Sequence, residues 1–100
     1  MNEWSSSSVI IRHDVGLHAR PSVKLTKLAK TFSSTIEISG SSEGPWIDAK
    51  SIVKVMGMKA KQDSTLHMRA SGGDAAAAVE ALKDLIERDF DEDRADAASG

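Results

Sequence analysis

The apolar residues in the C-terminal third of the chain change their spacing at a pair of glycines. Before Gly72 and Gly73 every second residue is apolar, which is the period of a strand with one buried face. After them the apolar residues return every third or fourth position, which is the period of an amphipathic helix. The segment therefore predicts a strand followed by a helix, each with one buried side. The apolar positions are Leu66, Met68 and Ala70 in the strand, and Ala75, Ala78, Val79, Leu82, Leu85 and Ile86 in the helix.

Three further segments predict strands. Val9 and Ile11 lie on one face of the first, and Ile36 and Ile38 lie on one face of the second. A third, short strand is expected around Ile47. Each would bury one side and leave the other in water.

Two further helices are predicted upstream of the glycine pair. One is indicated by a stripe of apolar residues at helical spacing, and a shorter one by Ser51 as its N-cap and Gly57 near its end. Asp74 is expected to cap the last helix with its carboxylate. The order strand, helix, strand, strand, helix, strand, helix predicts an α+β domain with an antiparallel sheet and all the helices on one face. The stripe of the first helix consists of Leu25, Leu28, Ala29 and Phe32.

Length and charge limit what the chain is expected to bind. A chain of 100 residues is the size of one domain, and a net charge of -2 gives no basic excess for nucleic-acid binding. There is no cysteine, and no apolar run approaches the roughly 20 residues of a membrane helix. His13 and His67 lack the spacing of metal ligands. We therefore expect a cytoplasmic monomer that needs no metal or cofactor and binds neither nucleic acid nor membrane.

The two ends of the chain differ in composition from the middle. Residues 1–7 are polar and serine-rich, and residues 91–100 are acidic and small. Both compositions are typical of flexible segments, so the folded domain is expected to span residues 8–90.

The stretch "GLHARP" places one histidine directly before a predicted helix. Pro21 suits the first turn of a helix, because its missing N–H would have no intrahelical partner there. The free backbone amides of Ala19 and Arg20, with the positive end of the helix dipole, then form an anion site beside His18. The Arg20 guanidinium adds a fork suited to phosphate oxygens. A neutral imidazole in this setting can attack phosphorus and hold the phosphate, although His18 as an ordinary exposed loop residue fits the position equally well.

A set of motifs resembles one known family. "GLHARP" with the helix after it, then "AKSIVKVMGM", then "ASGGDAAAAVEAL" resemble the HPr family, the histidine phosphocarriers of the bacterial phosphoenolpyruvate-dependent phosphotransferase system, from Val9 to Phe90. The resemblance implies an open-faced β-sandwich of four antiparallel strands and three helices. It also implies that enzyme I phosphorylates His18 on Nδ1, with Arg20 beside it, and that an enzyme IIA acceptor takes the phosphoryl group. Such a protein is a carrier and not a turnover enzyme.

Ser51 matches the regulatory serine of the family in "AKSIVKVMGM". The resemblance implies phosphorylation by an ATP-dependent HPr kinase/phosphorylase. A purely structural N-cap is the alternative for Ser51. A phosphate at this position would cost the fold little and would repel acidic partner surfaces.

The segment after Ser51 carries more apolar side chains than one short helix can bury. Exposed apolar side chains beside lysines are typical of a transient docking surface. Alternatively, Ile52, Val55 and Met56 are buried and only Val53 is exposed. The expected docking residues are Arg20, Lys24, Lys27, Ile52, Val53, Lys54 and Met56, with Lys50 in the same basic rim.

The chain departs from the usual family pattern in three places. The stretch "GSSEGPWIDAKS" is longer than the turn of many members, and Gln62 and Asp63 replace a frequent glycine turn. The third departure is at the ends, in the serine-rich start with Trp4 and in the acidic tail. Trp46 is expected to cover the sheet surface, and Trp4 to lie outside the ordered domain.

Two other functions remain open. One is a regulatory homologue that works through Ser51 or through docking without phosphorylation, for example in a nitrogen-related branch. The other is a small histidine-dependent hydrolase, for which the only acid close in sequence to His18 is Asp14.

Overall fold

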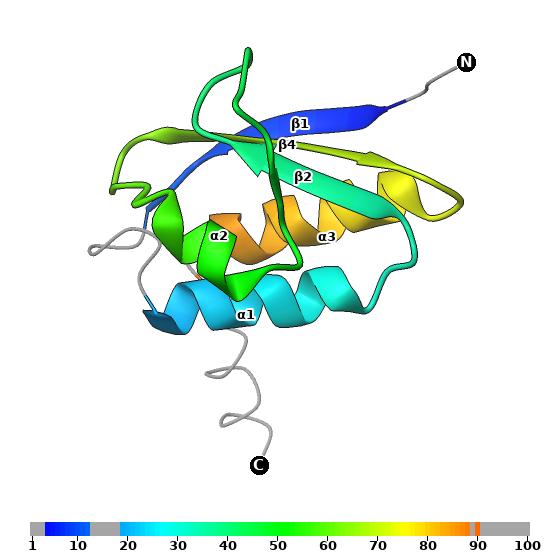
Figure 1. Ribbon diagram of the computed structural model, residues 1–100, viewed down its shortest axis with the longest axis horizontal. Helices are drawn as coiled ribbons and strands as arrows, with labels where there is room; N and C mark the ends of the chain where they lie inside the picture. Colours follow the sequence, from blue (N-terminus) through cyan, green and yellow to red (C-terminus); the bar gives the residue numbers. More distant parts are fainter. Residues whose placement is uncertain (1–3, 13–18, 89, 91–100) are drawn as a thin grey trace.

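A four-stranded antiparallel sheet carries three helices on one face (Figure 1). The computed structural model describes residues 4–12, 19–88 and 90. The strands lie in the order β1-β4-β2-β3, and every pairing is antiparallel. This is the open-faced α+β arrangement expected from the sequence, with its elements in the expected order. They are β1 (Ser5–Ile10), α1 (Ala19–Lys30), β2 (Thr35–Ser39), β3 (Ile47–Asp48), α2 (Ile52–Gly57), β4 (Thr65–Ser71) and α3 (Ala75–Glu87).

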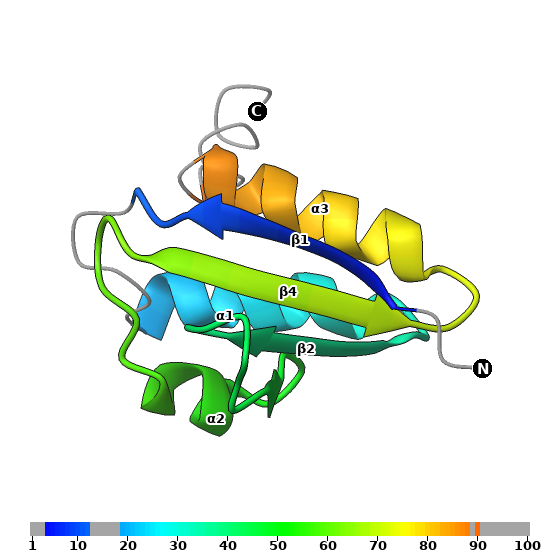
Figure 2. The same ribbon diagram turned by 90° about the horizontal axis from the view of Figure 1, so that it is seen from above.

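Strand β4 lies between β1 and β2 and organises the sheet (Figure 2). Its side chains alternate as predicted, with Leu66, Met68 and Ala70 completely buried against the helices. The residues between them, His67 and Arg69, are on the other face, which none of α1, α2 and α3 covers. We call that face the open face of the sheet.

Helix α3 packs against β1, β4 and β2 through the stripe predicted from the sequence. All six stripe residues are buried, and each fully buried leucine or isoleucine contributes about 1.5 to 3 kcal/mol relative to an exposed one. Helix α1 buries Leu25 and Ala29 and lies beside both α2 and α3. Within the described part of the chain, no helix combines the length and the apolar character that crossing a membrane requires.

Strand β1 begins at Ser5, before the expected start of the domain at residue 8. Ser5, Ser6 and Ser7 pair with residues of β4, and the register continues without a break to Ile10. Serines can extend a strand because the ladder uses backbone groups and needs no apolar side chain. At the other end Phe90 is buried, and residues 91–100 lie outside the described residues.

Asp74 precedes α3 as expected, but its carboxylate makes no cap hydrogen bond to that helix. It accepts hydrogen bonds instead from the backbone amides of Ser33, at 3.0 Å, and Ser34, at 2.9 Å, and from both serine hydroxyls. The expectation of a side-chain cap is therefore wrong. The α1–β2 turn offers four donors to one carboxylate, which outweigh the one or two amides of a cap.

The open face of the sheet carries a stacked cluster of charged and aromatic side chains. The Arg69 Cζ atom lies 4.4 Å from the ring centroid of Trp4 and 4.1 Å from that of Trp46. Its guanidinium also donates to Glu37 Oε1 on the neighbouring strand, at 2.7 and 2.9 Å. Trp46 covers the sheet as predicted, whereas Trp4 is part of the ordered structure, contrary to expectation.

Candidate functional site: the start of α1 and the adjoining face of α2

Helix α1 begins at Ala19, directly after His18 in the sequence. His18 itself lies outside the described residues, as do His13, Asp14 and Gly16. The first turn of α1 contains no acidic residue, so no carboxylate of the helix itself offsets the positive end of its dipole.

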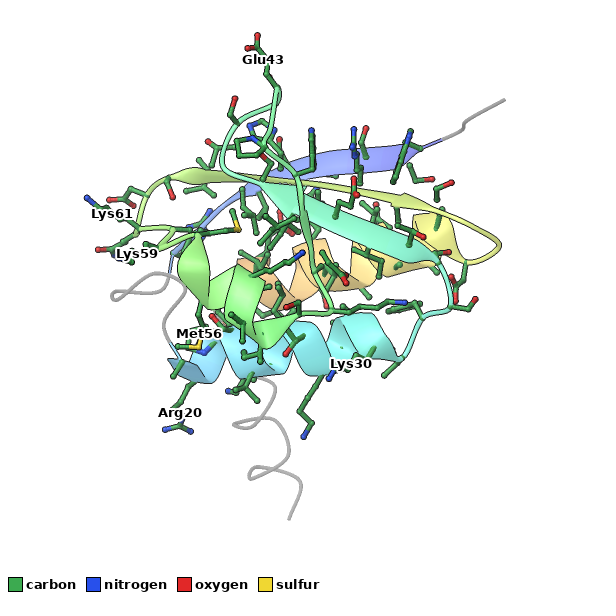
Figure 3. The ribbon with its side chains drawn as sticks, in the orientation of Figure 1. Arg20, Lys30, Glu43, Met56, Lys59 and Lys61 are labelled. Atoms are coloured by element: carbon green, nitrogen blue, oxygen red, sulfur yellow. The ribbon has the colours of Figure 1, made fainter. Side chains whose placement is uncertain are left out.

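Arg20 is exposed in the first turn of α1. Its guanidinium extends outward at the N-terminal end of the helix, at the same end of the molecule as Met56 (Figure 3). The neighbouring Pro21 is buried, as a first-turn proline can be without losing a hydrogen bond. The described part of the expected phosphate site thus offers a helix start with positive potential and one exposed guanidinium.

Ser51 is the N-cap of α2. Its backbone is extended, at φ -103 and ψ 111, and its hydroxyl oxygen accepts from the Lys54 amide at 3.3 Å. The Ser51 carbonyl accepts from the Val55 amide at 2.9 Å. The predicted cap is confirmed, and the side chain is half-exposed, so the hydroxyl remains within reach of solvent.

Two apolar side chains of α2 face the solvent. Val53 is 77% exposed and Met56 is 41% exposed, whereas Val55 is completely buried and Ile52 is half-buried. The alternative in which only Val53 is exposed is therefore wrong, because Met56 is exposed as well. Because α2 is only six residues long, Val55 is its one buried residue, and other side chains of the helix stay exposed.

Helix α1 adds an exposed apolar residue that the sequence analysis missed. Val23 is 44% exposed and lies two residues before the buried Leu25, off the apolar stripe of the helix. The exposure of Val23 could have been predicted from the sequence, because the residue lies outside the apolar stripe of α1. Helices α1 and α2 contact each other, so these side chains lie on adjoining helices, and we call the set expected to bind partners the docking face. It consists of Arg20, Val23, Lys24, Lys27, Ile52, Val53, Lys54 and Met56.

Two of the expected rim lysines have structural contacts. Lys50 Nζ donates to the Phe32 carbonyl at 2.8 Å, just beyond the end of α1. Its ammonium group therefore links the segment before α2 to the segment after α1. Lys24 Nζ donates to the Phe90 carbonyl at 2.6 Å. Lys27 and Lys54 are exposed. The basic rim of the docking face therefore depends mainly on Arg20, Lys27 and Lys54.

The comparisons with known proteins agree with this arrangement. A family model described as the PTS HPr component phosphorylation site matches residues 5–88. The chain belongs to the PTS HPr family. This is a family of phosphocarrier proteins.

Individual relatives cover nearly the whole domain. "Phosphocarrier protein NPr" of Proteus mirabilis is 38% identical over 85 residues, which is 85% of this chain and 93% of that protein. "Phosphocarrier protein HPr" of Cupriavidus necator is 43% identical over 82 residues, or 82% of this chain and 90% of that protein. Among solved structures, HPr-C-His from Thermoanaerobacter tengcongensis has a TM-score of 0.80 at 34% identity, covering 88% of this chain and 97% of that one.

The HPr family match agrees with the structure about where the domain starts. Both begin at Ser5, where β1 begins. The match also includes "GLHARP" and Ser51, so every residue expected at the site lies within it.

Proposed function

We propose that this chain carries phosphoryl groups in the phosphotransferase system. It accepts a phosphoryl group on Nδ1 of His18 from phosphorylated enzyme I and passes it to an enzyme IIA acceptor. The observation that carries the proposal is the match of the whole domain to the phosphorylation-site model of the HPr family, with the histidine retained directly before α1.

Each transfer exchanges one bond to phosphorus for another. The lone pair of neutral His18 forms the N–P bond while the bond from phosphorus to the donor atom breaks, and the second transfer repeats this with the acceptor as nucleophile. The backbone amides of Ala19 and Arg20 and the Arg20 guanidinium stabilise the negative charge on the phosphate. The exposed start of α1 supports this arrangement, because a partner can approach it directly.

The docking face supplies the contact with both partners. Val23, Val53 and Met56 provide exposed apolar surface, and Arg20, Lys27 and Lys54 provide positive charge around it. This composition suits short-lived complexes with acidic partner surfaces, in which charge speeds association more than it adds affinity. The carrier works as a monomer in the cytoplasm and leaves the remaining catalytic groups to its partners.

Ser51 provides control in the same proposal. A phosphate added there by an HPr kinase/phosphorylase would place two negative charges next to Val53 and Lys54, where an acidic partner approaches. The cap position tolerates that charge, because it lies at a helix N-terminus.

A nitrogen-related regulatory branch is a second candidate for the downstream acceptor. The observation that favours it is the 38% identity to the NPr of Proteus mirabilis, which is comparable with the 43% to the HPr of Cupriavidus necator. The chemistry at His18 is the same in both cases.

Incubation with enzyme I and labelled phosphoenolpyruvate tests the proposal. The chain should gain one phosphate that is labile in acid and stable in base, and the His18→Ala variant should gain none. Adding a sugar-specific or a nitrogen-branch enzyme IIA should then discharge it, and the faster acceptor identifies the branch. Normal labelling of His18→Ala, or no labelling of the parent chain, would contradict the proposal.

A further inference from the structure

An open cleft is lined without any residue of α1. It is bounded on one side by the β2–β3 loop, residues 40–46, and on the other by the end of α2 and the turn that leads to β4. In Figure 3 the loop carries Glu43 above the sheet, and Lys59 and Lys61 lie at the adjacent corner of the molecule. The cleft has a volume of about 910 Å³, which is at the upper end of the range for small-molecule sites.

One wall of the cleft is the Trp46 indole, and it is held in place from several directions. A side chain at Gly44, where φ is +90, would put its Cβ 2.9 Å from Trp46 Cδ1, so glycine lets the ring pack against the loop backbone. The ring also stacks on Arg69, which is fixed by two hydrogen bonds to Glu37. A wall that is already ordered lowers the entropic cost of binding.

The rest of the lining combines apolar surface with positive charge. Ile47, Met58 and Ala60 contribute apolar surface, and all three are only partly buried. Lys54, Lys59 and Lys61 line the same cleft.

The lining has three lysines against one carboxylate outside an ion pair, that of Asp48. Glu37 is paired with Arg69, and Asp48 Oδ1 accepts from the Lys50 amide at 2.9 Å. Among the described residues, Lys59 and Lys61 form no ion pair. An apolar cleft with an excess of lysines favours a ligand that has an apolar body and a negative charge.

The two walls of the cleft lie at or next to the segments that the sequence analysis expected to differ from many family members. One wall is the lengthened stretch "GSSEGPW", and the other leads into the turn with Gln62 and Asp63. Lys59 in this second wall and Asp63 in the turn after it have positive φ angles of 53 and 70, which non-glycine residues seldom adopt.

We propose that this cleft binds a small amphipathic anion. An aromatic or other flat apolar body packs against Trp46 and Met58, and a phosphate or carboxylate group is held by the lysines at the rim. No residue of α1 lines the cleft, and the proposal does not depend on phosphoryl transfer.

Titration of the ¹⁵N-labelled chain with 1-naphthyl phosphate, followed by NMR, tests the site. The amide signals of Gly40 and Gly57 and the indole N–H of Trp46 should shift together and saturate. Neutral 1-naphthol and inorganic phosphate, which each carry half of the required chemistry, should bind at least tenfold more weakly. Shifts centred on Ala19 and Arg20, or equal affinity for all three compounds, would overturn the proposal.

Paired lysine variants separate local charge from net charge. Lys59→Gln with Lys61→Gln should weaken binding of 1-naphthyl phosphate roughly threefold to tenfold, since each lysine contributes a partly screened charge interaction. Lys30→Gln with Lys83→Gln removes the same net charge outside the cleft and should leave the affinity unchanged. Equal loss in both pairs would show that only net charge matters and would contradict the proposal.

A variant that fills the cleft tests the apolar part. Gly40 lines the cleft and a Cβ there meets no atom within 4 Å, so Gly40→Phe is chosen to fill the cleft. It should abolish binding, and unchanged affinity would contradict the site. Both the lysine pair and Gly40→Phe should accept phosphate from enzyme I normally, so failure here leaves the proposed carrier function untouched.

Discussion

The Asp74 carboxylate joins the turn before α3 to the turn after α1. Four hydrogen bonds from Ser33 and Ser34 stabilise its charged form, and the Ser34 hydroxyl bond contributes most to lowering the pKa of Asp74 from 3.8 to about 2. Ser34 is buried and its hydroxyl also accepts from the Asp74 amide at 3.2 Å. One residue thus holds two loops that are forty positions apart in the sequence.

The Asp74→Asn variant should be less stable than the parent at neutral pH. A depressed carboxylate pKa stabilises the fold above the pKa of the unfolded chain, near 3.9, and this contribution disappears as the pH falls through about 2. Urea unfolding of both proteins should therefore show a constant difference above pH 5 that shrinks between pH 4 and pH 2. If the difference in unfolding free energy does not change with pH, the charge of Asp74 does not cause the loss of stability.

Arg20→Ala should slow phosphoryl transfer without changing the fold. The guanidinium is exposed and so contributes little packing, and loss of one charge-assisted hydrogen bond to a phosphate costs about 1.5 to 3 kcal/mol. The transfer rate constant from enzyme I should therefore fall roughly tenfold to a hundredfold. Rapid-quench measurements in both directions check this, with Lys30→Ala as the control. Unchanged rates would make Arg20 a bystander.

The turn between β4 and α3 depends on one glycine more than on its neighbour. At Gly72, where φ is +142, an added Cβ would lie 2.5 Å from Ser34 Oγ and 2.9 Å from Ser34 Cα, whereas at Gly73 it would meet nothing within 4 Å. Gly72→Ala should therefore lower the free energy of unfolding by about 1 to 3 kcal/mol, because it combines backbone strain with a clash. Gly73→Ala, the matched control, should change stability far less. Similar losses in urea unfolding at the two positions would contradict this explanation.

Ser51 is the N-cap of α2 and lies next to the residues proposed to bind partners. Aspartate is itself a good N-cap, so Ser51→Asp should keep the stability of the parent, whereas Ser51→Ala should lose about 1 kcal/mol. Next to Val53 and Lys54, the added charge should raise the KM of the carrier for enzyme I, and added salt should partly restore it.

KM measurements distinguish a Ser51 that only caps α2 from one that also lies in the partner interface. Steady-state transfer from enzyme I at two salt concentrations gives the KM values, and the same measurement on chain phosphorylated at Ser51 should show a larger increase. If phosphorylated and unmodified chains have equal KM values, Ser51 is only a helix cap.

Local patterns predicted most of the elements of this molecule, and contacts between distant segments account for the corrections. The stripe of α3 and the alternation of β4 were predicted correctly because each depends on neighbours within one element. The partner of Asp74 was missed because Ser34 is forty residues away, and the place of Trp4 was missed because Arg69 holds it from another strand. The exposure of Val53 was expected from the sequence, whereas the contacts of Lys24 and Lys50 with Phe90 and Phe32 depend on packing between distant segments, which a local sequence pattern does not show.

Deleting the first seven residues tests whether they stabilise the whole domain. Deleting residues 1–7 removes the pairs of Ser5, Ser6 and Ser7 with β4 and the stacking of Trp4 on Arg69. Because β4 lies at the centre of the sheet and packs on α3, this loss should destabilise the entire fold, by about 2 to 4 kcal/mol from the lost hydrogen bonds and cation–π contact. Deleting residues 1–3 keeps the pairs and the stack and should leave stability unchanged. Urea unfolding followed by circular dichroism measures both. If the longer deletion is as stable as the shorter one, residues 5–7 add nothing to the domain, and the boundary at residue 8 expected from composition would be the correct one.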